Sequence, residues 1–329
     1  MINPNQKLKE NIFDADVEQA PTRDGYGKGV LEAGEKDERI VVLCADLAES
    51  TRSHWFAEKF PKRYIELGVA EQNLATVASG MANYGKIPFI ASYAAFNPGR
   101  NNEQIRTTIS LNRVPVKVCG MHAGISVGPD GATHQALEDI ALMRVQPNME
   151  VIVPSDAEEA RKATVAAAFS GKPTYLRFAR EKTPVITTTD SLFKIGKANI
   201  LWESENPKAA IIACGSIMHN VLLAAKHLSE KGIGTIVINN HTIKPMDEKT
   251  IINAVEKTGA VVTVEEHQIA GGMGSAVAEV LAREYPVPIE FVGVCDRFGQ
   301  SGSPDELIKE YGIDTQSIIS AVLKVIRRI

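Results

Sequence analysis

Short apolar runs alternate with segments of helical periodicity along most of this chain. The runs lie at residues 39–44, 64–67, 88–92, 114–120, 150–154, 174–179, 209–214, 234–239, 260–265 and 289–294. Segments between them repeat apolar residues at the three- and four-residue spacing of a helix face. This alternation predicts an α/β fold with mainly parallel sheets covered by helices on both faces.

The alternation is interrupted once, which predicts two domains. After residue 184 the sequence becomes polar and rich in threonine, and no clear pattern returns until Ala209. We therefore expect a first domain at 1–187, a linker at 188–206 and a second domain at 207–329. Residues 1–22 are polar and without clear period, so we expect an N-terminal arm before a first helix that ends at Gly34.

Several helix starts carry recognisable signals. The sequences 155–158 and 303–306 both read as capping boxes, in which a serine and the glutamate three residues later satisfy each other's backbone amides. Glycines at 271, 272 and 274 precede another helix and allow two interpretations. They could seat a phosphate at the helix N-terminus, or they could permit close helix-to-strand packing, which we favour.

Composition excludes some classes of function. The 329 residues carry a formal charge of −4 and are 44% hydrophobic, which is typical of a globular protein and argues against nucleic-acid binding. No apolar run is long enough to span a bilayer, and the N-terminus lacks the apolar core of a signal peptide, so we expect a cytoplasmic protein. The cysteines lie far apart without metal-ligand spacing and are predicted to be reduced core thiols: Cys44, Cys119, Cys214 and Cys295.

The first candidate for chemistry is Glu71. It opens a helix directly after the apolar run that ends at Gly68, and Leu74, Ala78 and Met81 define a buried face beside it. An acidic residue in a first turn commonly serves only the helix dipole. A half-desolvated carboxyl beside a ligand crevice could instead move a proton, and its neighbours decide between these interpretations.

A second cluster occupies the loop 122–135, which offers His122, Asp130 and His134 between a strand and a helix. Its glycines allow turns that could aim both imidazoles into one crevice. No third residue completes a metal site, and no G-x-S-x-G motif supports a serine nucleophile.

Aromatic and basic residues flank the same loops. Tyr93 and Phe96 end a strand, where they form either a core patch or a surface that stacks on a flat heterocycle. Four arginines lie nearby and could bind anions, namely Arg23, Arg100, Arg177 and Arg180.

Taken together, the motifs resemble the C-terminal half of a transketolase from about Arg23 to the end of the chain. They are Gly68-Val-Ala-Glu-Gln72, Ser92-Tyr-Ala-Ala-Phe96, Gly128-Pro-Asp-Gly-Ala-Thr-His-Gln135, Val264-Glu-Glu-His267 with Gly271-Gly-Met-Gly274, and Asp296-Arg-Phe-Gly-Gln-Ser-Gly302. The family's magnesium–diphosphate motif, G-D-G followed by an asparagine, is absent. The resemblance therefore implies the C-terminal subunit of a split transketolase, with a pyrimidine-binding domain followed by a Rossmann-like transketolase C-terminal domain.

The resemblance also implies roles for the candidates. Glu71 matches the proton-relay glutamate that hydrogen-bonds the pyrimidine ring of thiamine diphosphate, and Tyr93 and Phe96 match the aromatic cradle of that ring. His134 matches a catalytic residue near the donor's hydroxyls. The remaining matches are substrate contacts to phosphate or hydroxyl groups: Arg23, Ser50, His122, Asp130 and Arg180.

The implied activity is transfer of a two-carbon ketol unit from a ketose phosphate to an aldose phosphate. A separate N-terminal subunit would bind the diphosphate and hold most of the Mg²⁺ coordination, and a dimer of this chain would lie within a heterotetramer. The sequence departs from the family after Phe96, where the third aromatic is missing, and Arg177 or Arg180 could hold the phosphate. Two alternatives are a subunit of a deoxyxylulose-phosphate-synthase-like enzyme and a non-catalytic pairing or regulatory subunit.

Overall fold

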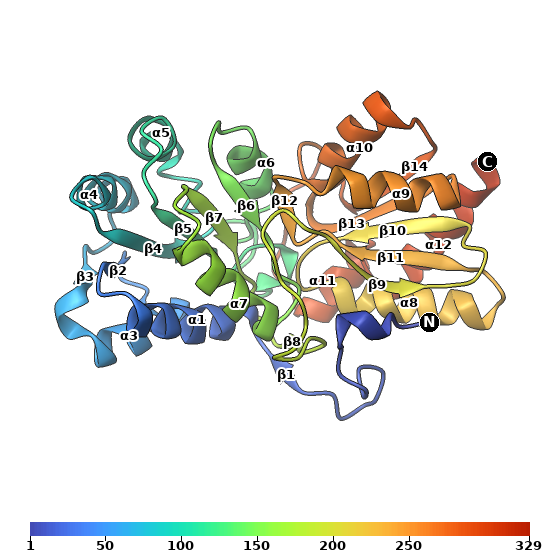
Figure 1. Ribbon diagram of the computed structural model, residues 1–329, viewed down its shortest axis with the longest axis horizontal. Coiled ribbons are helices and arrows are strands. Elements are labelled where there is room, and N and C mark those ends of the chain that lie inside the picture. The colour runs from blue at the N-terminus through green and yellow to red at the C-terminus, as the bar shows by residue number, and fades with distance from the viewer.

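The computed structural model describes residues 1–329 as two neighbouring parallel-sheet units with helices on both faces (Figure 1). The α/β class predicted from the alternation is confirmed, because the inner strands of both sheets are parallel. No helix in the chain combines the length and apolar character needed to cross a membrane.

The first sheet has seven strands in the order β12-β6-β7-β5-β4-β2-β3. Its strands are β2 (Ile40–Cys44), β3 (Tyr64–Glu66), β4 (Ile87–Tyr93), β5 (Lys117–Met121), β6 (Glu150–Ile152), β7 (Thr174–Arg177) and the antiparallel β12 (Thr242–Lys244). The inner strands are buried on both faces, which explains their nearly continuous apolar sequence.

Two groups of helices cover this sheet (Figure 1). On one face lie α1 (Thr22–Lys36), α3 (Ser53–Lys59) and α7 (Ala157–Ala168), and on the other lie α4 (Glu71–Asn83), α5 (Asn102–Gln104), the π-helix η3 (Ile105–Ser110) and α6 (Asp139–Arg144). Short helical turns complete the unit: α2 (Ala48–Thr51), η2 (Pro61–Arg63) and η4 (Ile125–Val127). Helices α1 and α7 approach closely, because a Cβ on Gly25 would lie 2.0 Å from the Ala157 carbonyl oxygen.

The second sheet has five strands in the order β14-β13-β10-β11-β9. They are β9 (Asn199–Glu203), β10 (Ala209–Ala213), β11 (Thr235–Asn239), β13 (Val261–Gln268) and β14 (Ile289–Val294). The helices of this unit are α8 (Met218–Glu230), α9 (Glu248–Thr258), α10 (Met273–Glu284), α11 (Pro304–Glu310), α12 (Thr315–Val325) and the terminal turn η5 (Ile326–Arg328). Helices α9 and α10 cover one face, and α8 and α12 cover the other (Figure 1).

Strand pairing joins the two units more closely than the alternating pattern predicts. Strand β12 follows the second unit's β11 in sequence but pairs with β6 of the first sheet, with Thr242 opposite Ile152. Strand β9 lies inside the expected linker and pairs antiparallel with β11. The largest apolar cluster also contains residues of both units, including Leu74 and Ile212. The interval 188–206 is therefore partly built into the second sheet.

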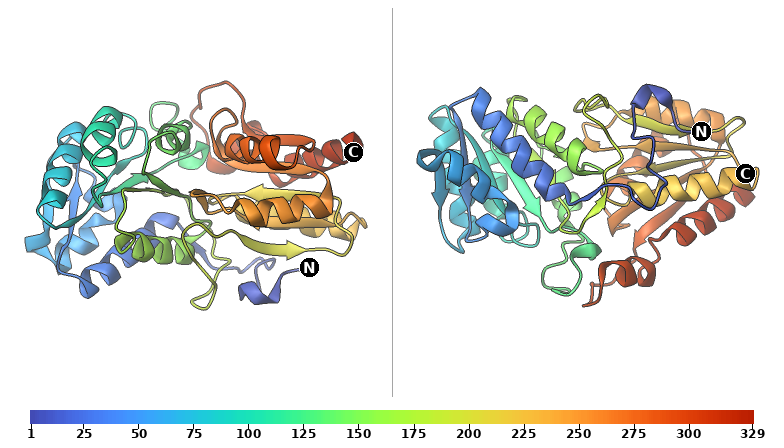
Figure 2. Two further views of the ribbon diagram at one scale, coloured as in Figure 1. Left: turned by 45° about the horizontal axis from the view of Figure 1, so that its top comes forward. Right: turned by 90° about the horizontal axis from the view of Figure 1, so that it is seen from below.

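The N-terminal arm crosses from the second unit to the first (Figure 2). The turn η1 (Pro4–Gln6) lies beside β9, because the Asn3 amide donates to the Leu201 carbonyl and the Phe13 ring meets the Trp202 ring edge to face at 6.4 Å. Strand β1 (Gln19–Ala20) then pairs with β8 (Thr183–Pro184) in a small separate sheet. The arm is thus anchored along its length despite its polar sequence.

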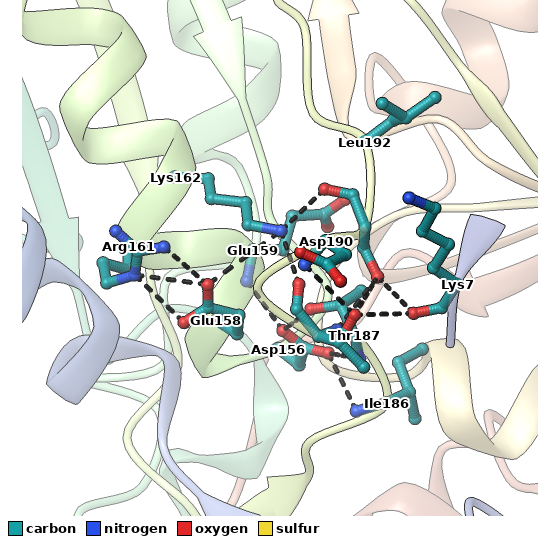
Figure 3. Close-up of polar contacts among 12 residues, drawn as sticks. Lys7, Asp156, Glu158, Glu159, Arg161, Lys162, Ile186, Thr187, Asp190 and Leu192 are labelled. Atoms are coloured by element: carbon teal, nitrogen blue, oxygen red, sulfur yellow. Dashed lines mark hydrogen bonds and ion pairs between the residues drawn. The ribbon is translucent and has the colours of Figure 1, made fainter. Parts of the chain in front are cut away.

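A buried polar network at the start of α7 fixes the end of the first unit (Figure 3). The Asp156 carboxylate accepts from the amides of Ile186 and Thr187 at 2.9 and 2.6 Å, and Lys162 donates to the carbonyls of Thr188 and Ser191 at 2.5 and 2.6 Å. Burial and the neighbouring Glu159 raise the pKa of Asp156 to about 6. The Asp156 side chain thus ties the start of α7 to the backbone of Ile186, 30 residues later in the sequence.

Two local predictions about this unit and its neighbour need correction. The capping box expected at Ser155 and Glu158 is displaced by one residue, because Asp156 caps α7 and Glu159 reaches back to the Ser155 amide. Cys295 is exposed, whereas the other three cysteines are buried, so the prediction of four core thiols is wrong at that position. It follows directly after β14, which is an edge strand paired on one side only.

Two other local predictions are confirmed. Ser303 and Glu306 form the predicted capping box of α11. The glycines before α10 serve packing, as favoured: a Cβ on Gly272 would lie 2.3 Å from the Glu265 carboxylate, and that carboxylate accepts from the Met273 and Gly274 amides at 2.7 and 2.8 Å. An internal anion therefore occupies this helix N-terminus.

Candidate functional site

The candidate residues converge at the carboxyl ends of the parallel strands of the first sheet. Open α/β sheets bind ligands at this edge. Glu71, Tyr93 and His122 each follow or end a strand there. A chain of contacts described below connects these residues with Phe96, His134, Arg23 and Ser50.

Glu71 is the first residue of α4 and is only 1% exposed. One carboxylate oxygen accepts from the Ser92 hydroxyl at 3.1 Å, and the other accepts from Nη1 of Arg100 at 2.5 Å. The Asn101 side-chain amide donates to the Glu71 carbonyl at 3.0 Å. The carboxylate is thus buried, fixed from two sides and compensated by one cation. The sequence missed both Ser92 and Arg100 as its partners.

Phe96 lies next to this pair and presents a ring face to it. The Arg100 guanidinium carbon is 4.5 Å from the centroid of the Phe96 ring, so the cation lies over the aromatic face while it donates to Glu71. Tyr93 and Phe96 are stacked with centroids 6.1 Å apart and planes 27° apart. The two aromatic residues therefore form one surface beside the buried acid rather than a closed core patch.

Both histidines of the loop 122–135 border that surface. The His122 ring stacks on Tyr93 with centroids 4.1 Å apart, and the His134 ring meets Tyr93 and Phe96 edge to face at 5.9 and 5.5 Å. His122 adopts a left-handed backbone conformation, with φ of 53°, which is unfavourable for a non-glycine residue. The strand end thus turns His122 back over Tyr93.

A guanidinium and an imidazole form the next contact. Nη1 of Arg23 donates to Nε2 of His122 at 2.8 Å and to the carbonyl of Ser50 at 3.0 Å. Burial, with the nearby charges of Arg23 and Arg180, lowers the pKa of His122 to about 3. The imidazole is consequently neutral at physiological pH and accepts through Nε2. Its buried Nδ1 and the buried Nε of Arg23 have no partner in the protein.

The surroundings of Arg23 carry several cations. Burial and the neighbouring Arg52 and Arg180 lower the pKa of Arg23. Arg52, which the sequence did not single out, pairs with Asp24 at 2.6 Å. Arg180 lies 3.4 Å from Asp130 and also donates to the Val127 carbonyl at 3.0 Å. Carboxylates compensate Arg52 and Arg180, whereas Arg23 forms no ion pair with a carboxylate, so Arg23 is the guanidinium that favours an anionic ligand.

The structure distinguishes Arg177 from Arg180. Arg177 is buried and forms a bidentate pair with Asp139, with nitrogen–oxygen distances of 2.7 and 3.2 Å, and it donates to the Ala136 and Glu266 carbonyls. Its donors are used inside the fold. Arg180 lies beyond the end of β7 with 31% of its side chain exposed. Of the two, only Arg180 is accessible to a ligand.

The second unit supports the histidine-bearing loop through residues that the sequence reasoning did not place in the site. Glu266, at the end of β13, accepts from the Ser126 amide at 3.1 Å and the Ser216 hydroxyl at 2.8 Å. Gln135 donates to the Gln300 carbonyl at 3.0 Å. The motifs at 264–267 and 296–302 therefore contact the loop 122–135 and hold it in place. The sequence showed that these motifs were present but not which residues they contact.

Two known protein-family domains match this chain. Residues 18–185 match the family described as transketolase, pyrimidine binding domain, and residues 196–318 match transketolase, C-terminal domain. The chain belongs to the transketolase family. The resemblance drawn from the motifs is thereby confirmed.

Among transketolase relatives, the chain is similar to a putative transketolase C-terminal section of Methanocaldococcus jannaschii, with 42% identity over 93% of this chain and 96% of the relative. A 6-deoxy-6-sulfo-D-fructose transketolase subunit of Clostridium sp. (strain MSTE9) is 38% identical over 96% of this chain and 98% of the relative. By contrast, the match to rat transketolase, at 35% identity, covers 97% of this chain but 50% of the relative.

The fold of this transketolase-family chain also resembles a solved relative. A split gene transketolase described as an inactive beta4 tetramer superimposes with a TM-score of 0.87 and 42% identity, over 94% of this chain and 99% of the other. The Campylobacter jejuni transketolase, at 23% identity and a TM-score of 0.80, shows the same fold with 50% of its chain covered.

Proposed function

We propose that this chain is the C-terminal subunit of a split, thiamine-diphosphate-dependent transketolase. In this proposal it binds the pyrimidine end of the cofactor and, with a separate diphosphate-binding subunit, transfers a two-carbon ketol unit from a ketose phosphate to an aldose phosphate. The observation that carries the proposal is the buried Glu71 carboxylate beside the half-buried aromatic surface of Tyr93 and Phe96.

The residues present fit an aminopyrimidine. Such a ring is flat and carries nitrogen groups at its edge. Its binding site therefore requires an aromatic side chain against the ring face and a hydrogen-bonding carboxyl at the ring edge. Phe96 and Glu71 already bind one flat nitrogen-bearing group, because the Arg100 guanidinium carbon lies over the Phe96 ring, 4.5 Å from its centroid, and Nη1 donates to the carboxylate. The residue after Phe96 is not a third aromatic but Asn97, which is buried and donates through its side-chain amide to the Ile90 and Cys119 carbonyls.

The cofactor, when bound, supplies the electron sink that stabilises the transferred carbanion. Glu71 holds or releases a proton at the pyrimidine ring nitrogen, in a position shielded from water. His134 lies at the edge of the aromatic surface formed by Tyr93 and Phe96. There it can donate hydrogen bonds to hydroxyl groups of a sugar and to charge that develops during the reaction.

The cations at the outer part of the site suit a phosphorylated sugar. Arg23 and Arg180 provide two guanidinium groups, and the neutral His122 provides an uncharged contact between them. Asp130, 3.4 Å from Arg180, can accept from a sugar hydroxyl. Ser50 is held beside Arg23 through its carbonyl, which leaves its hydroxyl available to a ligand. We assign these five residues to substrate binding.

The proposed partner supplies what these residues do not. Glu71, Tyr93 and Phe96 provide no phosphate-binding loop, and no cluster of three metal-ligating side chains lies in the chain. Mg²⁺ and the diphosphate would therefore be held mainly by the partner subunit. Relatives described as a transketolase C-terminal section and as transketolase subunits, matched over nearly their whole length, support this division.

Self-association is the second part of the proposed assembly. Apolar side chains are exposed beside the site and at the ends of α4 and η3, with Val69 70%, Tyr84 93% and Leu111 71% exposed. Exposed apolar side chains commonly lie at interfaces, and α4 and η3, which carry these residues at their ends, pack against each other. We propose that this side of the first unit joins two copies of this chain within a heterotetramer, and the solved relative is itself a tetramer.

Reconstitution tests the proposal. The chain should show no ketol transfer with thiamine diphosphate and Mg²⁺ when assayed alone, and should gain it when mixed with the diphosphate-binding subunit from the same organism. Heat-treated partner subunit is the control. Full turnover by the chain alone would refute the split-subunit assignment, and a mixture that binds cofactor without turnover would favour a non-catalytic pairing role.

A further inference from the structure

Arg100 has a position that the family resemblance does not explain. Its Nη1 donates to Oε2 of Glu71 at 2.5 Å, and its guanidinium carbon lies 4.5 Å from the Phe96 centroid. It therefore covers the aromatic face and occupies one oxygen of the buried acid at the same time. These are the two features of the site that a pyrimidine ring would need.

A guanidinium group and an aminopyrimidine share the relevant chemistry. Both are flat and delocalised, and both stack on aromatic rings. The N–H of the guanidinium also lies where a ring nitrogen that shares a proton with Glu71 would lie. Arg100 uses the Phe96 face and Oε2 of Glu71, and Ser92 donates to Oε1, so each carboxylate oxygen already has a partner. A pyrimidine ring that stacks on Phe96 and hydrogen-bonds Oε2 would therefore have to displace Arg100.

The burial of the pair shows which partner can leave. Glu71 has 1% of its side chain exposed and is held by Ser92 and the start of α4, whereas Arg100 has 45% exposed. The Arg100 guanidinium makes no other hydrogen bond or ion pair. It can swing into solvent by side-chain rotation alone, while Glu71 stays fixed.

The ion pair also leaves Glu71 with one replaceable contact. The Arg100 guanidinium compensates the charge of the buried carboxylate, which avoids an uncompensated buried charge. When the guanidinium leaves, Oε2 of Glu71 loses its hydrogen-bond donor, and a ring nitrogen of the cofactor would take that place.

We propose that Arg100 is a displaceable stand-in for the aminopyrimidine ring, which closes the site and compensates Glu71 until the cofactor enters. This inference rests on the proposed function, since it names what the cofactor displaces. It assigns Arg100 to the control of cofactor entry rather than to the bound complex.

Probe binding to the purified full chain tests the stand-in directly. Arg100→Ala should bind thiamine about fivefold more tightly than wild type by ligand-observed NMR titration, because an ion pair with a half-exposed arginine no longer competes. Arg100→Lys, which keeps the charge but loses the plane, should fall between them. Arg106→Ala is the matched control, because Arg106 is exposed on the adjoining π-helix and forms no side-chain hydrogen bond or ion pair.

Chemical rescue provides an independent readout. Arg100→Ala should have a lower Tm than wild type, and millimolar methylguanidinium should restore part of that loss, whereas it should leave wild type and Arg106→Ala unchanged. Thiamine should compete with methylguanidinium for the opened site.

The outcomes separate this inference from the proposed function. Weaker thiamine binding by Arg100→Ala would overturn the inference, because Arg100 would then be a cofactor ligand. Equal binding by wild type and Arg100→Ala would also overturn it, while leaving the pyrimidine site in place. Rescue by methylguanidinium without thiamine binding to any variant would refute the pyrimidine assignment and the stand-in together.

Discussion

Replacing Arg177 should lower the stability of the protein, whereas replacing Arg180 should weaken substrate binding. Arg177→Met removes a guanidinium that donates twice to Asp139, at 2.7 and 3.2 Å, and once to the Glu266 carbonyl at 2.8 Å. The Asp139 carboxylate would remain buried with only the Tyr175 hydroxyl, 2.6 Å away, as a side-chain donor. Loss of one partner from a buried pair costs about 3–5 kcal/mol of unfolding free energy.

The same pair predicts a pH dependence. Although burial opposes ionisation, the Arg177 guanidinium, His267 and hydrogen bonds from Arg177 and Tyr175 lower the pKa of Asp139. A carboxyl whose folded pKa is below its unfolded value contributes stability above the unfolded pKa, and this contribution disappears as pH falls through the folded pKa. Wild type should therefore lose more stability on acidification below about pH 4 than the double variant Arg177→Met, Asp139→Leu.

Urea unfolding at pH 7 measures the stability effect, and kinetics of the reconstituted enzyme measure binding. Arg180→Met should change the unfolding free energy by less than about 1 kcal/mol, because its side chain is partly exposed, but should raise KM for a sugar phosphate about tenfold or more. The double variant at Arg177 and Asp139 should recover most of the stability lost by Arg177→Met. A raised KM with intact stability for Arg177→Met, or equal destabilisation by both single variants, would refute the division of roles.

Three further outcomes are expected. Glu266→Ala should lower the unfolding free energy by about 2 kcal/mol and raise KM, because the Ser126 amide loses its acceptor. Glu266→Gln should have a smaller effect on both quantities. Unchanged kinetics in both variants would contradict the role of Glu266 in holding the loop 122–135. The difference in unfolding free energy between wild type and His122→Gln should shrink as pH falls below about 6.5, because a histidine whose folded pKa is lowered loses its stabilising contribution on acidification. Urea unfolding at several pH values measures this difference. A difference that does not change with pH would argue against a neutral buried imidazole. A thiol reagent should label Cys295 alone in the native chain, by mass spectrometry, and labelling of Cys119 at the same rate would disagree with its burial.

The parallel strands could be predicted because each carries its own signal. Residues 40–44 of β2 are all apolar and all buried, so the sequence run and the strand coincide. Strands β9 and β12 carry no such signal, and their pairing depends on distant partners such as Ile152. The type of an element could thus be predicted from its own residues, whereas the pairing that joins the two units could not.

The site was predictable in its members and not in its contacts. Motif spacing brought Glu71, Tyr93 and His122 together, and the structure places them at one sheet edge. The pairing of Glu71 with Arg100 spans 29 residues and depends on which rotamer reaches the Phe96 face, which no pattern encodes. Arg177 differs from Arg180 only in lying within β7 rather than beyond it, and strand ends are poorly defined by sequence.

In the proposed function, Glu71 is the proton relay of a cofactor held jointly with a partner subunit. Glu71→Gln tests this role in the reconstituted complex, with thiamine diphosphate binding followed by circular dichroism and ketol transfer measured on the same sample. The variant keeps the shape of the side chain, so we expect a folded complex that still binds cofactor and a turnover lowered by about 10²–10⁴-fold. Turnover within a few-fold of wild type, with cofactor bound, would contradict the role of Glu71 as proton relay.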